Sequence, residues 1–173
     1  MVEGGKPGIA QHPSYRQLYT PTESSKVIPY LLKQHTKFKC KVTSFTASVQ
    51  TGNVHGHGIY FRAKNAAQVM LLHLERLNLR HKAVVLRDFN APSSSWGYQY
   101  MNSRGTCLAD GTQQKDLSLL SNPAVETFRR GQTESLLDLG FGNPNVGVHH
   151  VTTIFTGSEH AQIDMRFESH LEK

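Results

Sequence analysis

Two polar residues with complementary chemistry follow a short apolar run of the sequence. The run Ala83-Val84-Val85-Leu86 has the composition of a fully buried strand, and Asp88 and Asn90 come directly after it. In an extended segment these two side chains would point to one side, with Phe89 turned into the core. A carboxylate can orient or deprotonate a water, and an amide can steady a phosphoryl oxygen. The pair predicts a site for phosphoryl chemistry, and the alternative is an Asp-Asn turn that merely ends a strand.

His55 and His57 form a second pair that could bind a ligand. Two histidines at positions i and i+2 of a strand could share a metal ion, but the sequence places no third ligand nearby. The alternative is a hairpin turn between a β-rich segment and the next short strand. We expect the hairpin turn.

The elements that must position these residues are a mixture of helix and strands. Residues 65–79 predict a helix, because apolar residues recur there at helical spacing. The segments with the composition or the alternation of strands are 41–51, 58–61, 83–86 and 161–168. A helix that leads through a short connection into a buried strand makes an α/β unit, so we expect the α/β class with substantial sheet.

Length and composition exclude several classes of protein. A chain of 173 residues fits one domain, 1–173, and it has no apolar stretch near the roughly 18 residues of a membrane span. Its first residues lack the apolar region of a signal peptide. The two cysteines, Cys40 and Cys107, have no zinc-finger spacing, and we expect ordinary buried thiols. The composition favours an intracellular protein of the nucleus or cytoplasm.

The net charge of +6 is distributed unevenly along the chain. Residues 1–87 hold 13 Lys and Arg against 3 Asp and Glu, whereas residues 88–173 hold 6 against 10. A basic half suits a protein that binds a polyanion, and an acidic half can keep carboxylates for a metal. The alternative is a basic face that only improves solubility.

A succession of short motifs follows Asp88 in a definite order. The motifs are Asp88-Phe89-Asn90-Ala91-Pro92, Trp96-Gly97, Ser103-Arg104-Gly105 with Leu108, Leu119-Leu120-Ser121-Asn122-Pro123, Thr127-Phe128-Arg129-Arg130-Gly131, Asp138-Leu139-Gly140-Phe141 and Gly157-Ser158-Glu159-His160. Together they resemble the endonuclease domain of non-LTR (LINE-type) retrotransposons, a branch of the endonuclease/exonuclease/phosphatase superfamily. The best-matched part is 58–168, where Gly58-Ile59-Tyr60-Phe61 is similar to a strand of that family.

The resemblance implies a four-layer α/β sandwich and cleavage of DNA phosphodiester bonds with Mg²⁺, or Mn²⁺ in its place. At the matching positions, Asp88 would orient or deprotonate the attacking water, and Asn90 would bind the scissile phosphate. His160 would contact the phosphate and stabilise the transition state, with its imidazole oriented by Asp138. Tyr60 would donate a hydrogen bond to the phosphate. Glu3 would ligate the metal, and Glu159 would be a second residue at the metal.

The sequence departs from the family pattern at three positions. Arg87 replaces a glycine, Glu159 replaces an aspartate, and Val2 replaces a glutamine. The family's first strand and its phosphate-binding Asn have no counterpart, so we expect an N-terminally truncated, diverged domain. The alternative function is therefore a catalytically inactive nucleic-acid-binding remnant of a transposon reading frame. A phosphatase of the same superfamily is a third possibility, but the Trp-Gly and Leu-Leu-Ser-Asn-Pro motifs favour the retrotransposon branch.

Six residues are candidates for nucleic-acid binding outside the catalytic set. Trp96 could stack on a nucleotide at the rim of the site, or it could pack over the edge of the core. Arg129 and Arg130 could bind phosphates or be solvated loop charges. The basic half contributes Lys37, Lys39 and Lys41. The partners implied are DNA and the RNA of the same element, with no membrane, and we expect a monomer.

Overall fold

The structure, a computed structural model, describes residues 15–18, 30–33, 39–42, 46–59, 67–79 and 81–167. Its helices are α1 (Ala67–Glu75), α2 (Ser103–Gln114) and the short 3₁₀ helix η1 (Ser94–Trp96). Neither α1 nor α2 has the length and apolar composition of a membrane-spanning segment. The strands are β1 (Tyr15–Leu18), β2 (Tyr30–Lys33), β3 (Lys39–Val42), β4 (Thr46–Thr51), β5 (Val54–Ile59), β6 (Lys82–Asp88), β7 (Ser118–Leu119), β8 (Phe128–Arg130), β9 (Thr133–Ser135), β10 (Asp138–Gly142), β11 (Val148–Ile154) and β12 (Gln162–Phe167).

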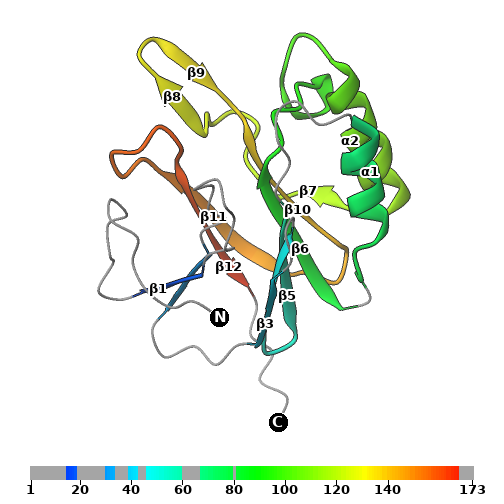
Figure 1. Cartoon of the computed structure of the whole chain (residues 1–173). Coiled ribbons are helices and arrows are strands. Elements are labelled where there is room, and N and C mark those ends of the chain that lie inside the picture. The colour runs from blue at the N-terminus through cyan, green and yellow to red at the C-terminus, as the bar shows by residue number, and fades with distance from the viewer. Residues whose placement is uncertain are drawn as a thin grey trace.

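A six-stranded mixed sheet forms the centre of the fold, with strand order β3-β4-β5-β6-β10-β7. The β5–β6 pair is parallel, because α1 carries the chain back across the sheet between these strands. The other neighbours in the sheet are antiparallel. This βαβ unit confirms the expected α/β class (Figure 1).

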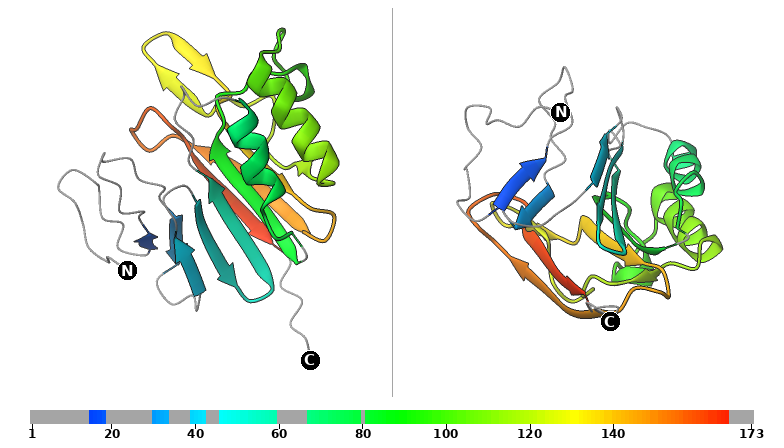
Figure 2. Two further views of the ribbon diagram at one scale, coloured as in Figure 1. Left: turned by 45° about the vertical axis from the view of Figure 1, so that its right-hand side comes forward. Right: turned by 90° about the horizontal axis from the view of Figure 1, so that it is seen from below.

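The central sheet is covered by helices on one face and by strands on the other. Helices α1 and α2 pack side by side on the first face, and the β11–β12 pair lies across the second (Figure 2). Contact between the two sheets is close at Gly140, where an added Cβ would collide with the end of the Met165 side chain. The described residues therefore form three of the four layers that the resemblance implies.

The core fills the space between the helices and the central sheet. Its largest fully buried side chains include Phe89, Met70, Leu74 and Leu108. The two helices approach closely at Gly111, where an added Cβ would lie 2.8 Å from a terminal methyl of Leu71. Burial of these aliphatic and aromatic groups supplies the main driving force for folding.

Most expected elements are present, with shifted ends. The helix predicted over 65–79 is observed as α1, and the backbone carbonyl of its last residue, Glu75, accepts a hydrogen bond of 2.7 Å from Lys115 Nζ. The apolar residues that lengthened the prediction, Leu77 and Leu79, pack against the core from the loop after the helix. The buried strand at 83–86 is the middle of β6, and the alternating segment at 161–168 is β12. The segment 41–51 contains the end of β3 and all of β4.

The histidine pair lies inside strand β5, so the expected hairpin turn at His55 and His57 is wrong. The turn occupies Gly52 and Asn53, with Gly52 at a φ of 56°, and β4 pairs with β5 on either side of it. His57 is buried and its Nδ1 lies 3.0 Å from the hydroxyl of Ser48. No cluster of three potential ligands that could hold a metal is present among the described residues.

This arrangement predicts a loss of stability at mildly acidic pH. Burial, with a smaller contribution from His55, lowers the pKa of His57 from its ordinary value of 6.5. Burial and His81, whose ring stacks 4.9 Å from that of His55, lower the pKa of His55. The unfolded chain therefore binds more protons, and stability is lost as the pH falls below 6.5.

We expect the melting temperature to fall between pH 7.5 and pH 5.5, and His57→Gln to reduce this difference. His150→Gln, at an exposed histidine, is the matched control and should leave the difference unchanged. An unchanged pH dependence in His57→Gln, measured by thermal denaturation, would refute the assignment.

Candidate functional site

Two carboxylates lie next to each other where two inner strands of the central sheet meet its upper end, at the end of one strand and the start of the other. Asp88 is the last residue of β6, and Asp138 is the first residue of β10. These residues are direct cross-strand partners in the antiparallel β6–β10 pair. Directly opposed side chains in such a pair share one face of the sheet, with Cβ atoms about 5 Å apart. The register therefore places the two carboxylates at the carboxyl end of the buried strand.

His160 joins this pair from the far end of the sequence. Its Nδ1 lies 2.8 Å from Oδ2 of Asp138, and because a carboxylate can only accept, Nδ1 donates. The Nε2 atom is then the ring atom left to face a ligand, on a side chain that is 44% exposed. Burial raises the pKa of Asp138, and its hydrogen bond with His160 opposes that shift. The contact expected between Asp138 and His160 is present.

Thr127 is a buried residue that the sequence reasoning did not single out. Its hydroxyl accepts a hydrogen bond of 2.8 Å from the backbone N–H of Asp138. Its own N–H donates to the carbonyl of Ser135, and its carbonyl accepts from the N–H of Ala161. Thr127 therefore fixes the start of β10, the hairpin and the segment after His160 relative to one another. Only its place in the Thr-Phe-Arg-Arg-Gly motif could have indicated this role from the sequence, because its hydrogen-bond partners are distant in sequence.

The β8–β9 hairpin holds the loop that carries His160. Phe128 and His160 form an isolated β-bridge, and their rings lie 5.0 Å apart. The N–H of Arg129 donates to the carbonyl of Glu159 at 2.8 Å. Within the loop, the hydroxyl of Ser158 donates to the carbonyl of His160. These contacts set the orientation of the imidazole.

The backbone at Asn90 corrects one step of the sequence reasoning. Phe89 is fully buried, as expected. Asn90, however, has a φ of 43°, in the left-handed region that asparagine tolerates better than most residues. The chain therefore turns at Asn90 instead of continuing as a strand, so the alternation argument does not apply to it. Asn90 is exposed, two residues after Asp88.

The start of α2 holds the loop that follows Asn90. The side chain of Asn102 caps the helix by accepting a hydrogen bond of 2.8 Å from the N–H of Gly105. The backbone N–H of Asn102 donates to the carbonyl of Pro92. Nη2 of Arg104 donates to the carbonyl of Phe89 at 2.9 Å. The Ser-Arg-Gly motif is therefore a support for the loop that carries Asn90.

Two further polar side chains, both missed from the sequence, fix strand β10 in its register. Ser121 Oγ accepts from the N–H of Gly140 at 2.7 Å. Asn143 accepts from the N–H of Ala83 and donates to the carbonyls of Leu79 and His81. Because the register of β10 decides which residue faces Asp88, these contacts indirectly place Asp138.

Trp96 does not lie at the rim of the site, where it could have stacked on a nucleotide. Its side chain is 2% exposed, its Nε1–H donates to the carbonyl of Ala91 at 2.8 Å, and its ring packs edge-on against Phe141. A buried indole cannot stack on a nucleotide, so core packing is the correct interpretation. The exposed aromatic residue of this loop is Tyr100, which packs edge-on against Tyr98.

The two arginines of the hairpin and Glu159 are engaged in ion pairs. Arg130 donates to both carboxylate oxygens of Glu159, at 2.7 and 2.6 Å. Arg129 contacts Glu134 at 2.8 Å, and its guanidinium lies 4.2 Å from the ring centre of Phe155. Glu159 is thus paired with an arginine in the structure, and its expected place at a metal stays a prediction.

Several expected site residues lie outside the described part of the chain: Glu3, Lys37 and Tyr60. Lys39 is exposed at the start of β3, and Lys41 belongs to the same strand. Cys107 is half-buried and packs against the core, close to its expected role, whereas the side chain of Cys40 is outside the described set. Among the residues of the site that the structure describes, Asp88 has an exposed carboxylate, at the end of β6.

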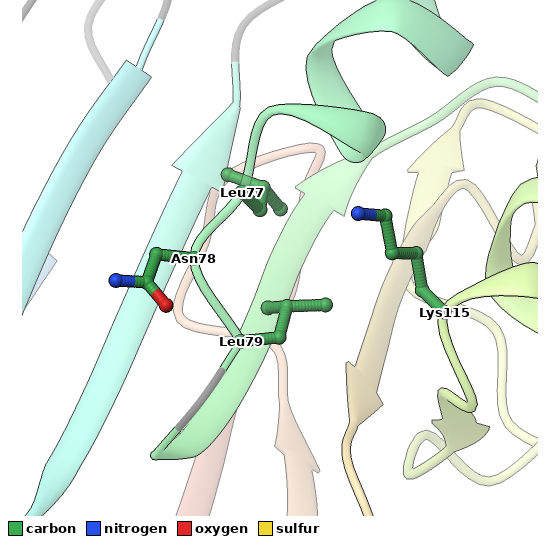
Figure 3. Close-up of a pocket in the computed structure, with 4 residues that line it drawn as sticks. All are labelled: Leu77, Asn78, Leu79 and Lys115. Atoms are coloured by element: carbon green, nitrogen blue, oxygen red, sulfur yellow. The ribbon is translucent and has the colours of Figure 1, made fainter.

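The structure also has an open hollow that is distinct from this site. Leu77, Asn78, Leu79 and Lys115 line it (Figure 3). Leu77, Asn78 and Leu79 come just before the first residue of β6, whereas Asp88 is its last residue, so the hollow and Asp88 are about 20 Å apart along the strand. The hollow marks the junction of the two helices with the sheet, and the described residues of its lining include no acidic or imidazole group.

Comparisons with known proteins identify relatives of this arrangement. The family described as endonuclease-reverse transcriptase matches residues 54–164. No curated protein matches the sequence. Among solved structures, the endonuclease domain of TRAS1, a telomere-specific non-LTR retrotransposon, is similar with a TM-score of 0.75. That match has 16% identity and covers 94% of this chain and 83% of that one.

Two Neisseria structures are also similar. The 3′-5′ exonuclease NExo from Neisseria meningitidis matches with a TM-score of 0.57 and 12% identity, over 90% of this chain and 80% of that one. The 3′ phosphatase NExo bound to a product DNA hairpin matches with a TM-score of 0.56 and 11% identity, over the same shares. At these identities the matches establish a shared α/β fold.

Proposed function

The chain belongs to the endonuclease-reverse transcriptase family, and on that premise we propose that it hydrolyses phosphodiester bonds of DNA with a divalent metal ion. One observation supports this proposal above the others. The Asp138–His160 hydrogen bond lies beside Asp88, at the carboxyl end of a buried strand. The three residues are 72 positions apart at their extremes, so the fold has brought them together.

Each side chain of this group has a chemical task in the proposed reaction. Asp88 accepts a proton from a water, or orients it, as its oxygen attacks phosphorus. Nε2 of His160 contacts the phosphate and stabilises the charge that develops on its oxygens. Asp138 keeps the imidazole in the required tautomer and orientation. A new P–O bond forms with the water oxygen, the P–O bond to a deoxyribose oxygen breaks, and a proton ends on that leaving oxygen.

The residues that would surround a metal ion fit Mg²⁺ or Mn²⁺. Magnesium is often bound by one or two carboxylates, with the remaining ligands from substrate phosphate and water. The exposed carboxylate of Asp88 would supply one such ligand. The expected roles of Glu3 and Glu159 at the metal, and of Tyr60 at the phosphate, stay predictions. When bound, the ion would neutralise charge on the phosphate. Asn90 would bind a phosphate oxygen next to it.

A cleavage assay on a labelled DNA duplex tests the proposal. We expect shorter products in the presence of Mg²⁺ or Mn²⁺ and none in EDTA, with Asp88→Ala inactive. An RNA duplex of the same sequence measures whether the RNA of the element is a second substrate. Cleavage that does not depend on Asp88 would contradict the proposed site.

The second candidate function is a nucleic-acid-binding remnant without activity. The Arg130–Glu159 ion pair favours this candidate, because Glu159, at the position of the family's aspartate, is paired with an arginine. This candidate predicts binding of DNA without cleavage under any metal. The expected monomeric state, the single domain and the nuclear or cytoplasmic location stay predictions under both candidates.

Both candidates predict that DNA affinity falls steeply with salt. The basic half of the chain would neutralise phosphates and release counterions, and each contact contributes about 0.9 to the slope of log K against log salt. Replacing Lys37, Lys39 and Lys41 together with glutamine should weaken binding and reduce this slope by about one unit for each lost contact. Fluorescence anisotropy at several salt concentrations measures both. An unchanged slope would show that these lysines only improve solubility.

A further inference from the structure

The β8–β9 hairpin places a bidentate ion pair next to His160. Nε of Arg130 donates to one carboxylate oxygen of Glu159 at 2.7 Å, and Nη2 donates to the other at 2.6 Å. Two parallel bonds from the guanidinium fork are also the geometry by which arginine binds a phosphate. Glu159 therefore occupies the position that a phosphate would take on this guanidinium.

The guanidinium is close to the proposed catalytic group. Its Cζ lies 5.6 Å from the ring centre of Phe128, and the ring of Phe128 lies 5.0 Å from the ring of His160. Figure 1 shows the hairpin and the loop between β11 and β12 beside each other at the same end of the molecule. A DNA strand in contact with His160 would therefore pass within reach of Arg130.

The ion pair can open without a change in the backbone around it. The carbonyl of Glu159 is fixed by the N–H of Arg129, and the N–H of Ala161 is fixed by the carbonyl of Thr127. The two side chains themselves are 69% and 49% exposed. Exposed ion pairs contribute little to stability, because water and salt compete with them. A phosphate can therefore exchange with the carboxylate on the guanidinium.

We propose that Arg130 is a phosphate-binding residue and that Glu159 occupies it as an internal substitute until the DNA backbone displaces the carboxylate. The inference rests on the proposed nucleic-acid function of the same site. It predicts that Glu159 weakens DNA binding only by competing with phosphate for Arg130, so that Glu159 has no effect once Arg130 is removed. It also accounts for a glutamate at this position, since the longer side chain reaches the hairpin.

The other arginine of the hairpin offers a matched comparison. Arg129 pairs with Glu134, which faces it across the β8–β9 ladder. Arg129 is also held over the ring of Phe155, so loss of its carboxylate partner leaves a second contact in place. Glu134→Gln likewise removes one negative charge that is paired with an arginine of the hairpin, and it measures the general effect of charge on DNA affinity.

The test is a thermodynamic cycle on DNA affinity. The full chain and the variants Glu159→Gln, Arg130→Gln, Arg130→Gln/Glu159→Gln and Glu134→Gln are titrated against a fluorescent 20-base-pair DNA duplex in EDTA, which prevents cleavage. We expect Glu159→Gln to bind about two to five times more tightly, and Arg130→Gln to bind about three to ten times more weakly. The double variant should match Arg130→Gln, and Glu134→Gln should gain less than Glu159→Gln.

Other outcomes overturn the inference in distinguishable ways. If Glu159→Gln increases DNA affinity equally with and without Arg130, the carboxylate repels the DNA phosphates directly. Displacement of Glu159 from Arg130 by a phosphate is then wrong. If Glu159→Gln and Arg130→Gln both bind more weakly, the pair only supports the hairpin. In these cases the proposed cleavage function still stands. If the unaltered chain does not bind the duplex, both the inference and the proposed function fail.

Discussion

Replacing His160 with alanine is expected to lower the rate of metal-dependent DNA cleavage by about 10²–10⁴-fold, with little change in DNA affinity. A positioned proton-transfer or charge-stabilising group contributes on this order. The imidazole is held at 2.8 Å from Asp138 and bridged to Phe128, so its loss removes an oriented group and not merely a contact. The measurement is the single-turnover rate on a labelled duplex at saturating enzyme.

The hydrogen bond between His160 and Asp138 also predicts the cleavage rates of the Asp138 variant and of the double variant. Asp138→Ala should be nearly as slow as His160→Ala, and the double variant should be little slower than either, because the residues act as one unit. His150→Ala, at an exposed histidine in β11, is the matched control and should keep full activity. Additive losses in the double variant would show that Asp138 acts on the reaction independently of His160.

Replacing Gly105 with alanine is expected to destabilise the chain by more than about 2 kcal/mol, which is large for a single substitution. An added Cβ would lie 2.8 Å from the carbonyl carbon of Pro92 and still closer to its oxygen. Because both atoms are backbone, the loop from Asn90 to Pro92 would have to move. Alanine gains about 1 kcal/mol of helix propensity over glycine, so the observed loss is what remains after that gain.

Gly111→Ala in the same helix is the control for this prediction. Its added Cβ would meet methyl groups of Leu71 and Leu74, which are the ends of flexible side chains. The gain in helix propensity should therefore offset most of the crowding. Thermal denaturation of both variants measures the difference, at about 2–4 °C for each kcal/mol in a chain of this size. Equal melting temperatures for the two variants would contradict the role assigned to Gly105.

The sequence allowed prediction of those features that depend on local pattern. Helix α1 and the alternating strand β12 have a strong periodicity, and β6 is a short continuous apolar run; each is present. The contact between Asp138 and His160 followed from the resemblance, because a family motif preserves partners that are distant in sequence. Neither periodicity nor composition could have predicted a hydrogen bond across 22 positions.

Features that depend on long-range packing were not predictable in the same way. The place of Trp96 in the core depends on its packing against Phe141, which is distant in sequence. The histidines of β5 were misplaced because the turn formed at Gly52, where a positive φ is tolerated by glycine. The partner of Glu159 depends on the hairpin, whose position next to the loop is set by Thr127.

The most direct test of metal-dependent cleavage at Asp88 is the nicking of supercoiled plasmid DNA by the chain and by its Asp88→Asn variant, each with Mg²⁺ and with EDTA. The asparagine keeps the shape of the side chain and removes the charge beside Asp138. We expect nicked circles from the unaltered chain with Mg²⁺ alone, and a rate at least about 100-fold lower from the variant. Equal nicking by the two proteins, or DNA binding by the unaltered chain without any nicking, would contradict it.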